Sequence, residues 1–408
     1  MHRVVITGLG AVTPLGHTVA EYWSNLKQGK SGLGPISSAV VQPDDLQPLT
    51  QKVVAEVKEF DPLKHFEERD LPTLDRVSQF AVVAAREAIA QAGITFDMPL
   101  SLRTACIIGT GVGGQTTHDD CMRRIYYERK TRAYPFTIPK LMVNAPASQI
   151  TMICGLRGPA FAIASACASA THAIGVAFHM VRSGMVDCAV TGGTEACITF
   201  ATVRGWEGMR VMAPDACRPF SIDRKGLILG EGGACLVLET LEHAKARGAS
   251  MIAEIAGFGM TADAGDLTAP DEGGMSRAME GALKDGGLKP QDIQYVNAHG
   301  TGTAANDTTE TKALHLAFGN RAKKLAVSST KSMIGHALGA AGALEFVAAV
   351  MAVHDDIAPP TIGYLGRDPS CDLDYVPNEA RTMPITAAIS NSFAFGGLNA
   401  VLAVKKFS

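Results

Sequence analysis

The chain has 408 residues, of which 47% are hydrophobic and 19% are charged, and its formal net charge is -3. This composition excludes a disordered or fibrous protein and provides enough apolar residues for a large core. The slightly negative charge argues against a dedicated nucleic-acid-binding protein, which would normally present a basic face.

Predicted strands and helices alternate along the chain. A β-branched run at 3–10 predicts a first strand that is stopped by glycines, and the same cadence at 253–259 suggests two halves of similar design. A helix predicted at 168–183, ending at Gly184, is apolar on nearly every face, which places it in a buried layer between sheets. The other predicted strands are 105–108, 188–191, 234–238, 295–297, 325–328, 387–390 and 400–404, and a second helix is predicted at 78–93. This alternation is typical of layered α/β folds.

The cysteines and apolar stretches indicate the compartment. Nine cysteines lie mostly in apolar segments without CxxC spacing, and no signal peptide precedes the first strand. We therefore expect a cytoplasmic protein with no disulfide and no metal site. The longest apolar stretch, at 338–353, contains Glu345 and ends in a charged run, so it predicts a core helix and no membrane span.

Two glycine-rich motifs resemble phosphate-binding loops without completing their pattern. Gly8-Leu9-Gly10 follows a strand, but Thr13 stands where a dinucleotide fingerprint needs its third glycine. The run at 109–114 lacks an evident phosphate-binding helix start, so we interpret it as tight packing near an interface.

Cys167 is the first candidate for chemistry. It lies in GPAFAIASACASATHAIG, at the start of the predicted alanine-rich helix, where backbone N–H groups and the helix dipole favour a thiolate and small neighbours leave room for an electrophile. An isolated buried cysteine is more often a small hydrophobic residue. Two histidines in equally small, glycine-rich segments favour the catalytic interpretation: His299 in NAHGTGT and His336 in SSTKSMIGH. One thiol and two imidazoles suit acyl-thioester chemistry.

With Gly396-Gly397-Leu398-Asn399 near the end, these three residues make the chain resemble the elongating 3-oxoacyl-[acyl-carrier-protein] synthases, that is, the beta-ketoacyl-[acyl-carrier-protein] synthase II family. The resemblance covers essentially the whole chain, and the segment WEGMRVMAPD followed by CRPFS is most similar to the nodulation protein E subgroup. It implies an α/β fold, the thiolase-like duplicated five-layer αβαβα sandwich. The N-terminal half would span 1–250 with the nucleophile and dimer contacts, and the C-terminal half 251–408 with both histidines and a gating loop.

The resemblance also implies an acyltransferase that catalyses a decarboxylative Claisen condensation. Cys167 would accept the acyl chain, with its own backbone N–H and that of Phe395 binding the developing oxyanion. Malonyl-acyl carrier protein would then lose carbon dioxide, and the Nε2–H groups of His299 and His336 would stabilise the enolate. No cofactor is implied, because the acyl carrier protein carries the phosphopantetheine.

Further positions take roles from the same resemblance. Lys331 would organise the histidines, Glu345 would hold Lys331 or a local polar network, and Phe395 would act as a gate over the acyl pocket. The matched substrate contacts are Thr268, Thr301 and Thr303, which would touch the pantetheine arm. Val112 would line the far end of the acyl pocket of the other subunit in a homodimer.

Carrier proteins are acidic, so the enzyme needs a basic landing surface. Arg129 and Lys130, in the densest basic cluster, match a docking pair of the family, whereas Glu207 stands near a position where arginine is common. The alternative function is a noncatalytic chain-length partner of a heterodimeric ketosynthase, although such proteins typically lack the nucleophile. The acyl chain, the pathway and the cognate carrier are not determined by the sequence.

Overall fold

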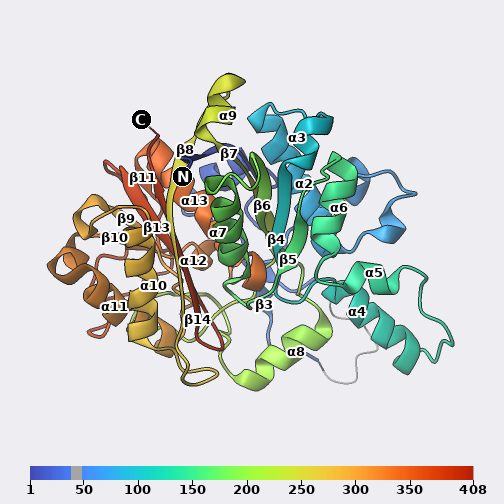
Figure 1. Ribbon diagram of the computed structural model, residues 1–408. Helices are drawn as coiled ribbons and strands as arrows, with labels where there is room; N and C mark the ends of the chain where they lie inside the picture. The colour runs from blue at the N-terminus through green and yellow to red at the C-terminus, as the bar shows by residue number, and fades with distance from the viewer. Residues whose placement is uncertain (38–47, 408) are drawn as a thin grey trace.

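The computed structural model describes residues 1–37 and 48–407, whose main strands form two similar five-stranded halves of one ten-stranded sheet (Figure 1). The first half has the order β5 (Ala160–Ile163), β4 (Thr104–Gly109), β6 (Cys188–Glu195), β7 (Gly232–Thr240) and β1 (Val4–Val12). The second half has the order β10 (Ala326–Ser328), β9 (Tyr295–Asn297), β13 (Ala387–Ala394), β14 (Leu398–Lys405) and β8 (Ala253–Ala262). Numbered along the chain within each half, both orders are 3-2-4-5-1, which confirms the predicted duplication.

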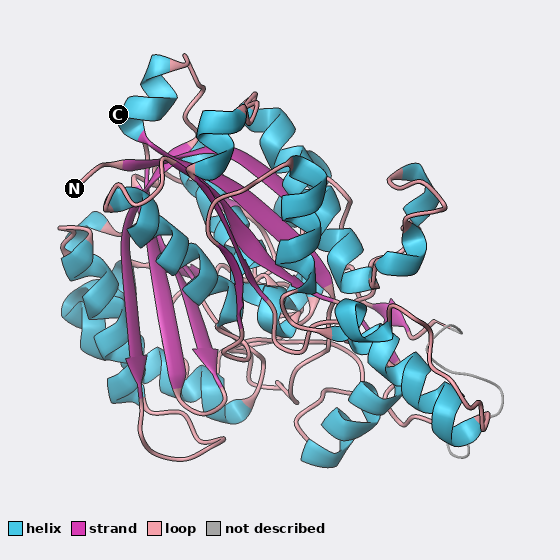
Figure 2. Cartoon of the chain, turned by 45° about the vertical axis from the view of Figure 1, so that its right-hand side comes forward, coloured by secondary structure: helices cyan, strands magenta, loops and turns pink. Residues whose placement is uncertain are grey.

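Helices cover both outer faces and fill the space between the halves (Figure 2). The outer helices are α2 (Arg76–Ala92) and α6 (Ala145–Cys154) on the first half, and α10 (Glu272–Asp285) and α11 (Ala304–Phe318) on the second. The central helices are α7 (Ser169–Arg182) and α13 (Ala341–Asp355), each of which contacts strands of both halves. The predicted five-layer αβαβα sandwich is therefore confirmed, while the division at residue 250 stays a prediction.

The shorter elements connect these layers. The helices are α1 (Val19–Lys27), α3 (Met98–Leu102), α4 (Gln115–Met122), α5 (Thr137–Leu141), α8 (Phe200–Met209), α9 (Leu241–Ala246) and α12 (Lys331–Ile334), with a π-helical turn η3 (Arg123–Tyr127). The 3-10 turns are η1 (Pro62–Lys64), η2 (Leu71–Thr73), η4 (Pro290–Asp292), η5 (Gly319–Lys324) and η6 (Leu338–Ala340). Two small hairpins pair β2 (Gly34–Pro35) with β3 (Val53–Val54) and β11 (Ile357–Ala358) with β12 (Arg381–Thr382).

The prediction that glycines stop the first strand is wrong. β1 continues through Gly8 and Gly10. Glycine is needed at both positions for a different reason, because a Cβ at either one would lie 1.9 Å from a carbonyl oxygen of α2. Gly257 and Gly259 repeat the arrangement in β8, where a Cβ would lie 2.2 and 2.1 Å from carbonyl oxygens of α10. These glycines let an outer helix approach the sheet backbone closely. The repeated cadence of the sequence therefore records helix–sheet packing in both halves.

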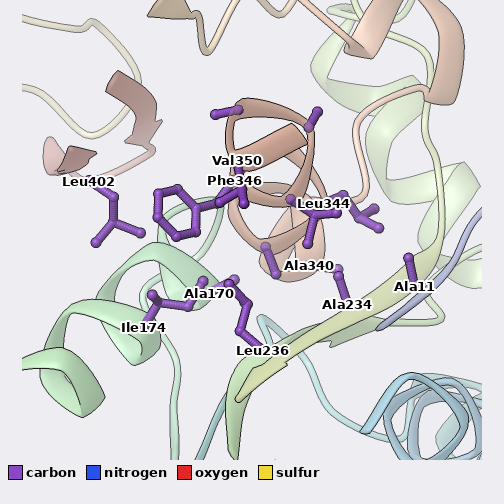
Figure 3. Packing of buried hydrophobic residues seen from close by; sticks show 14 of the residues in the cluster. Ala11, Ala170, Ile174, Ala234, Leu236, Ala340, Leu344, Phe346, Val350 and Leu402 are labelled. Carbon is purple, nitrogen blue, oxygen red and sulfur yellow. The ribbon is translucent and has the colours of Figure 1, made fainter. Parts of the chain in front are cut away.

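Helix α13 forms the centre of the core. Figure 3 shows Leu344, Phe346 and Val350 between Leu236 of β7 and Leu402 of β14. Among the described residues, the segment Leu338–Asp355 is the one helix long and apolar enough to cross a membrane, and most of it is buried inside the protein. Burial on all sides explains its nearly uniform apolar composition and confirms the predicted core helix.

The sheet topology gathers the functional segments at strand ends. β4, β5 and β6 run parallel, as do β9, β10 and β13, so the chain leaves each set of three at one edge. In open α/β sheets, ligand sites form outside the carboxyl ends of strands. The β13–β14 hairpin and α8 lie together at the lower end of Figure 1, away from both termini.

Candidate active site

Cys167 follows β5 and lies two residues before α7 begins at Ser169. The preceding residue, Ala166, adopts a φ of 48°, a left-handed conformation that a residue with a Cβ rarely takes. This turn directs the chain from the edge strand into the central helix and leaves Cys167 buried, with 6% of its surface exposed. The Cys167 N–H has no acceptor among the described residues.

The imidazole of His336 contacts the thiol of Cys167. Its Nε2 lies 3.1 Å from the Cys167 Sγ. The segment 228–230 holds the His336 backbone, because its N–H donates to Ile228 (2.7 Å) and its carbonyl accepts from Gly230 (2.9 Å). The His299 ring lies nearly perpendicular to the His336 ring, with centroids 5.3 Å apart. The fold therefore brings together one thiol and two imidazoles from three distant segments.

Lys331 fixes the orientation of His299 from behind. Its Nζ lies 3.3 Å from His299 Nδ1 and also donates to Glu345 Oε1, and both charged side chains are completely buried. A lysine ammonium donates only, so His299 Nδ1 accepts and the proton of the neutral ring lies on Nε2. This tautomer leaves His299 with an N–H donor on the side away from Lys331.

Burial controls the protonation of the three central groups. It lowers the pKa of both His299 and His336 well below 6.5, with Lys331 acting in the same direction, so both rings are neutral at pH 7. Burial raises the pKa of the Cys167 thiol to about 12, against the positive charge of Lys331. Desolvation therefore opposes the predicted stabilisation of a thiolate at the helix start. His336 Nε2 is placed to accept the thiol proton.

Two buried carboxylates that sequence reasoning missed hold the His299 segment. Glu310 accepts from the backbone N–H groups of His299 and Gly300, both at 2.8 Å, and from Asn391 Nδ2 at 3.1 Å. Asp307 accepts from the N–H of Gly302 at 3.2 Å. The two acids are three residues apart on α11, directly after the histidine segment, and that spacing on one helix face was the available clue.

A cavity of about 350 Å³ opens onto these groups. Its apolar wall includes Trp206, which sequence reasoning had not assigned to the site and which stacks on Phe395 with ring centroids 5.9 Å apart. Predicted site residues that line the cavity are Cys167, His299, His336, Thr268, Thr301, Thr303 and Phe395, whereas Lys331 and Glu345 lie buried behind it.

The three threonines lie at different depths. The Thr301 and Thr303 hydroxyl oxygens are 2.9 Å apart, and Thr303 also caps α11 by accepting from the Asn306 N–H. Thr268 is exposed in the loop at the cavity mouth, where its hydroxyl donates to Asp266. Hydroxyl groups along one wall suit a chain with amide groups.

Phe395 lies in the turn between β13 and β14, closed by the pair of Ala394 and Leu398. Its N–H, like that of Cys167, has no acceptor among the described residues. Gly397 has a φ of 69°, and a Cβ there would lie 2.6 Å from Asp263, so this position requires glycine.

Besides Lys331 and Glu345, three predicted residues do not line the cavity. Val112 follows β4, with 44% of its surface exposed and its N–H 3.4 Å from Glu195 of the same chain. Arg129 and Lys130 are exposed in the turn after η3. The contribution of Val112 to a partner's pocket and the docking role of the basic pair stay predictions.

Comparison with known proteins agrees with this geometry. The N-terminal domain of beta-ketoacyl synthase matches residues 1–244 and the C-terminal domain matches residues 252–365. Nodulation protein E of a Rhizobium species is 47% identical, with 99% of each chain covered. The 3-oxoacyl-[acyl-carrier-protein] synthase 2 of a Synechocystis species is 43% identical, with 99% of this chain and 98% of the relative covered.

Solved structures are similar over the full length of both chains. The ishigamide ketosynthase/chain length factor has a TM-score of 0.93 at 34% identity, with 100% of each chain covered. A type II PKS acyl-carrier protein in complex with its ketosynthase bound to the hexaketide has a TM-score of 0.88 at 30% identity, again covering 100% of each chain. The chain therefore belongs to the beta-ketoacyl synthase family, the condensing enzymes of fatty acid or polyketide synthesis.

Proposed function

We propose that this chain is a 3-oxoacyl-[acyl-carrier-protein] synthase whose acyltransferase step uses Cys167 as nucleophile. The observation that carries the proposal is the 3.1 Å contact between Cys167 Sγ and His336 Nε2 at the base of a cavity that His299 also lines. A thiol beside a neutral imidazole can attack a thioester once the imidazole accepts its proton.

In the first step the Cys167 sulfur attacks the acyl thioester while His336 Nε2 takes the thiol proton. The carbonyl oxygen becomes negative in this attack, and the N–H groups of Cys167 and Phe395 supply donors for it. The tetrahedral intermediate then expels the pantetheine thiolate, which receives the proton from His336. The acyl chain is left on Cys167, and both imidazoles are again neutral.

In the second step malonyl-acyl carrier protein loses carbon dioxide and its thioester becomes an enolate. His299, whose Nε2 carries the proton because Nδ1 accepts from Lys331, donates to the enolate oxygen, and His336 supplies the second donor after its single ring proton has moved from Nδ1 to Nε2. The enolate carbon attacks the acyl-Cys167 carbonyl, the carbon–sulfur bond breaks, and 3-oxoacyl-acyl carrier protein forms. Uptake of one proton restores the thiol.

The alternative, a noncatalytic chain-length partner, is disfavoured by the complete reacting set. A protein without catalytic function has no need for a buried thiol in contact with a neutral imidazole and a buried Lys331–Glu345 pair behind it. Burying these polar and charged side chains reduces the stability of the protein, so their presence indicates a function.

Substitution of the nucleophile tests the proposed function. Cys167→Ala should abolish condensation, whereas Cys167→Gln should retain malonyl decarboxylation, because glutamine occupies the place of the acyl-cysteine without accepting a chain. Mass spectrometry after incubation with acyl-carrier protein should find the acyl mass on Cys167 of the wild type. Cys121→Ala, outside the cavity, is the matched control and should behave as the wild type. Elongation by Cys167→Ala would overturn the proposal.

We also propose that Arg129 and Lys130 contribute to carrier docking, supported by their exposure and positive charge. Glutamates at both positions should raise KM for acyl-carrier protein strongly and leave turnover of an acyl-pantetheine mimic nearly unchanged. The control is the Lys284→Glu, Lys289→Glu double variant at and just after the end of α10, which makes the same change in charge. Helix α10 lies on the opposite side of the molecule from α4 and α5 (Figure 1). Equal loss on carrier and mimic would mean damage to the fold or the active site.

A homodimer is proposed from the outer edge of the first half. β5 is the terminal strand of the sheet, so its outer backbone groups are available to another chain. Phe161 on β5 is exposed, and α5 packs on α6 beside that strand. Further exposed apolar side chains lie on α5 and in the segments next to it in the chain: Tyr126, Tyr134, Phe136, Ile138 and Met142. An apolar surface of this kind suits a second copy of the chain. Sedimentation that finds only monomers at micromolar concentration would contradict this assignment.

Two further parts of the proposal concern the compartment and the acyl substrate. A cytoplasmic location is supported by nine cysteines that are all free in the structure. Condensation assays across acyl chain lengths and degrees of unsaturation would identify the substrate.

A further inference from the structure

Glu195 at the carboxyl end of β6 is a buried carboxylate to which the proposed chemistry assigns no role. It is fully buried and accepts four hydrogen bonds. Oε1 accepts from the Thr110 hydroxyl (3.0 Å) and the Val112 N–H (3.4 Å), and Oε2 accepts from the N–H groups of Gly111 (2.7 Å) and Gly339 (2.9 Å). No lysine, arginine or histidine forms an ion pair with it within the part of the chain that the structure describes.

The four donors belong to two separate segments. Three of them form the turn after β4 that carries Val112, and the fourth, Gly339, lies three residues after His336 in the turn that leads into α13. The two turns are in direct contact, as the space around Gly339 shows: a Cβ there would lie 2.1 Å from the Gly111 nitrogen and 2.5 Å from Glu195 Oε2. Glu195 Oε2 therefore bonds to both segments.

These four donors oppose the effect of burial on the charge of Glu195. Burial raises its pKa to about 7, and the hydrogen bonds from Gly111, Thr110, Gly339 and Val112 oppose that rise. Only a carboxylate offers two oxygens that accept at all four positions, since the NH2 group of an amide would face either the Val112 N–H or the N–H groups of Gly111 and Gly339. Burial of the Glu195 carboxylate costs free energy, so its presence indicates that the protein needs the geometry of these four hydrogen bonds.

We propose that Glu195 is a positioning residue that fixes the Val112 turn and the His336 turn relative to each other, and thereby selects which acyl chains react with Cys167. The inference rests on the proposed function, because it assumes that Cys167 is acylated and that Val112 lies at the end of the acyl pocket. If the two turns are held by one carboxylate, weakening it should change the acyl pocket and the approach of His336 together.

The test compares Glu195→Gln with Glu239→Gln, a control in an equally buried carboxylate of β7 that bonds to Thr7 and Arg247 and lies outside the cavity. Acylation of Cys167 is followed by mass spectrometry with short-chain and long-chain acyl-carrier protein, beside thermal unfolding. We expect the ratio of long-chain to short-chain kcat/KM to change by at least about fivefold in Glu195→Gln and less than about twofold in Glu239→Gln.

A milder variant keeps the test decisive if Glu195→Gln does not fold. Thr110→Val removes one of the four donors with little change of shape, and it should shift the same ratio in the same direction by a smaller factor. Equal loss for all chain lengths in both Glu195→Gln and Thr110→Val would overturn the inference. Absence of any acyl mass on Cys167 of the wild type would instead overturn the proposed function.

Discussion

The Lys331–Glu345 pair offers the sharpest test of how the site is built. Both side chains are completely buried, and Glu345 Oε2 has no partner among the described residues. Lys331→Met leaves a buried carboxylate without its cation, and Glu345→Gln leaves a buried ammonium without its anion. Breaking a buried pair by removing one partner costs about 3–5 kcal/mol. Each single variant should therefore lose about that much free energy of unfolding.

The double variant separates the pair from its surroundings. It buries a thioether and a neutral amide and leaves no unpaired charge, so its loss should be smaller than the sum of the two single losses by about 3 kcal/mol or more. Urea unfolding of the four proteins gives these values, provided that the m value is unchanged. Additive losses, with a coupling below about 0.5 kcal/mol, would refute an interacting buried pair.

Activity distinguishes the two partners. Lys331→Met removes the donor to His299 Nδ1, so the Nε2–H tautomer is no longer enforced, and malonyl decarboxylation should fall by about 100-fold or more. Glu345→Gln keeps Lys331, whose Nζ–H groups can still donate to His299, so its decarboxylation should fall much less. Equal activity losses in variants of equal stability would contradict the orienting role of Lys331.

Two further predictions concern the nucleophile and the acyl pocket. Because the pKa of the Cys167 thiol is about 12, its thiolate fraction increases with pH, and the rate of alkylation by iodoacetamide should rise about tenfold per pH unit between pH 7 and 9; a plateau below pH 8 would contradict this. Val112→Phe should shorten the longest acyl chain accepted, measured from the products of condensation with malonyl-acyl carrier protein. Unchanged product length would show that Val112 does not lie at the end of the pocket.

The sequence by itself determined the layered α/β architecture and its duplication. Strand periodicity, the repeated glycine cadence and the apolar helix after Cys167 are local properties, and the structure confirms the layers and the duplication that they predicted, although the glycines do not stop the first strand. The candidates for catalysis were also readable, because Cys167, His299 and His336 each lie in small, glycine-rich segments that few structural roles require.

Only the tertiary structure decided how these groups act. The contact of His336 with Cys167, the tautomer of His299 and the protonated resting thiol arise from burial between two halves that are distant in sequence. The role of Glu195 depends on backbone N–H groups that converge on its carboxylate from the turn after β4 and from the turn before α13, which are far apart in the chain. A side chain's charge and hydrogen-bond partners depend on every group packed around it, and that packing exists only when both halves have folded together.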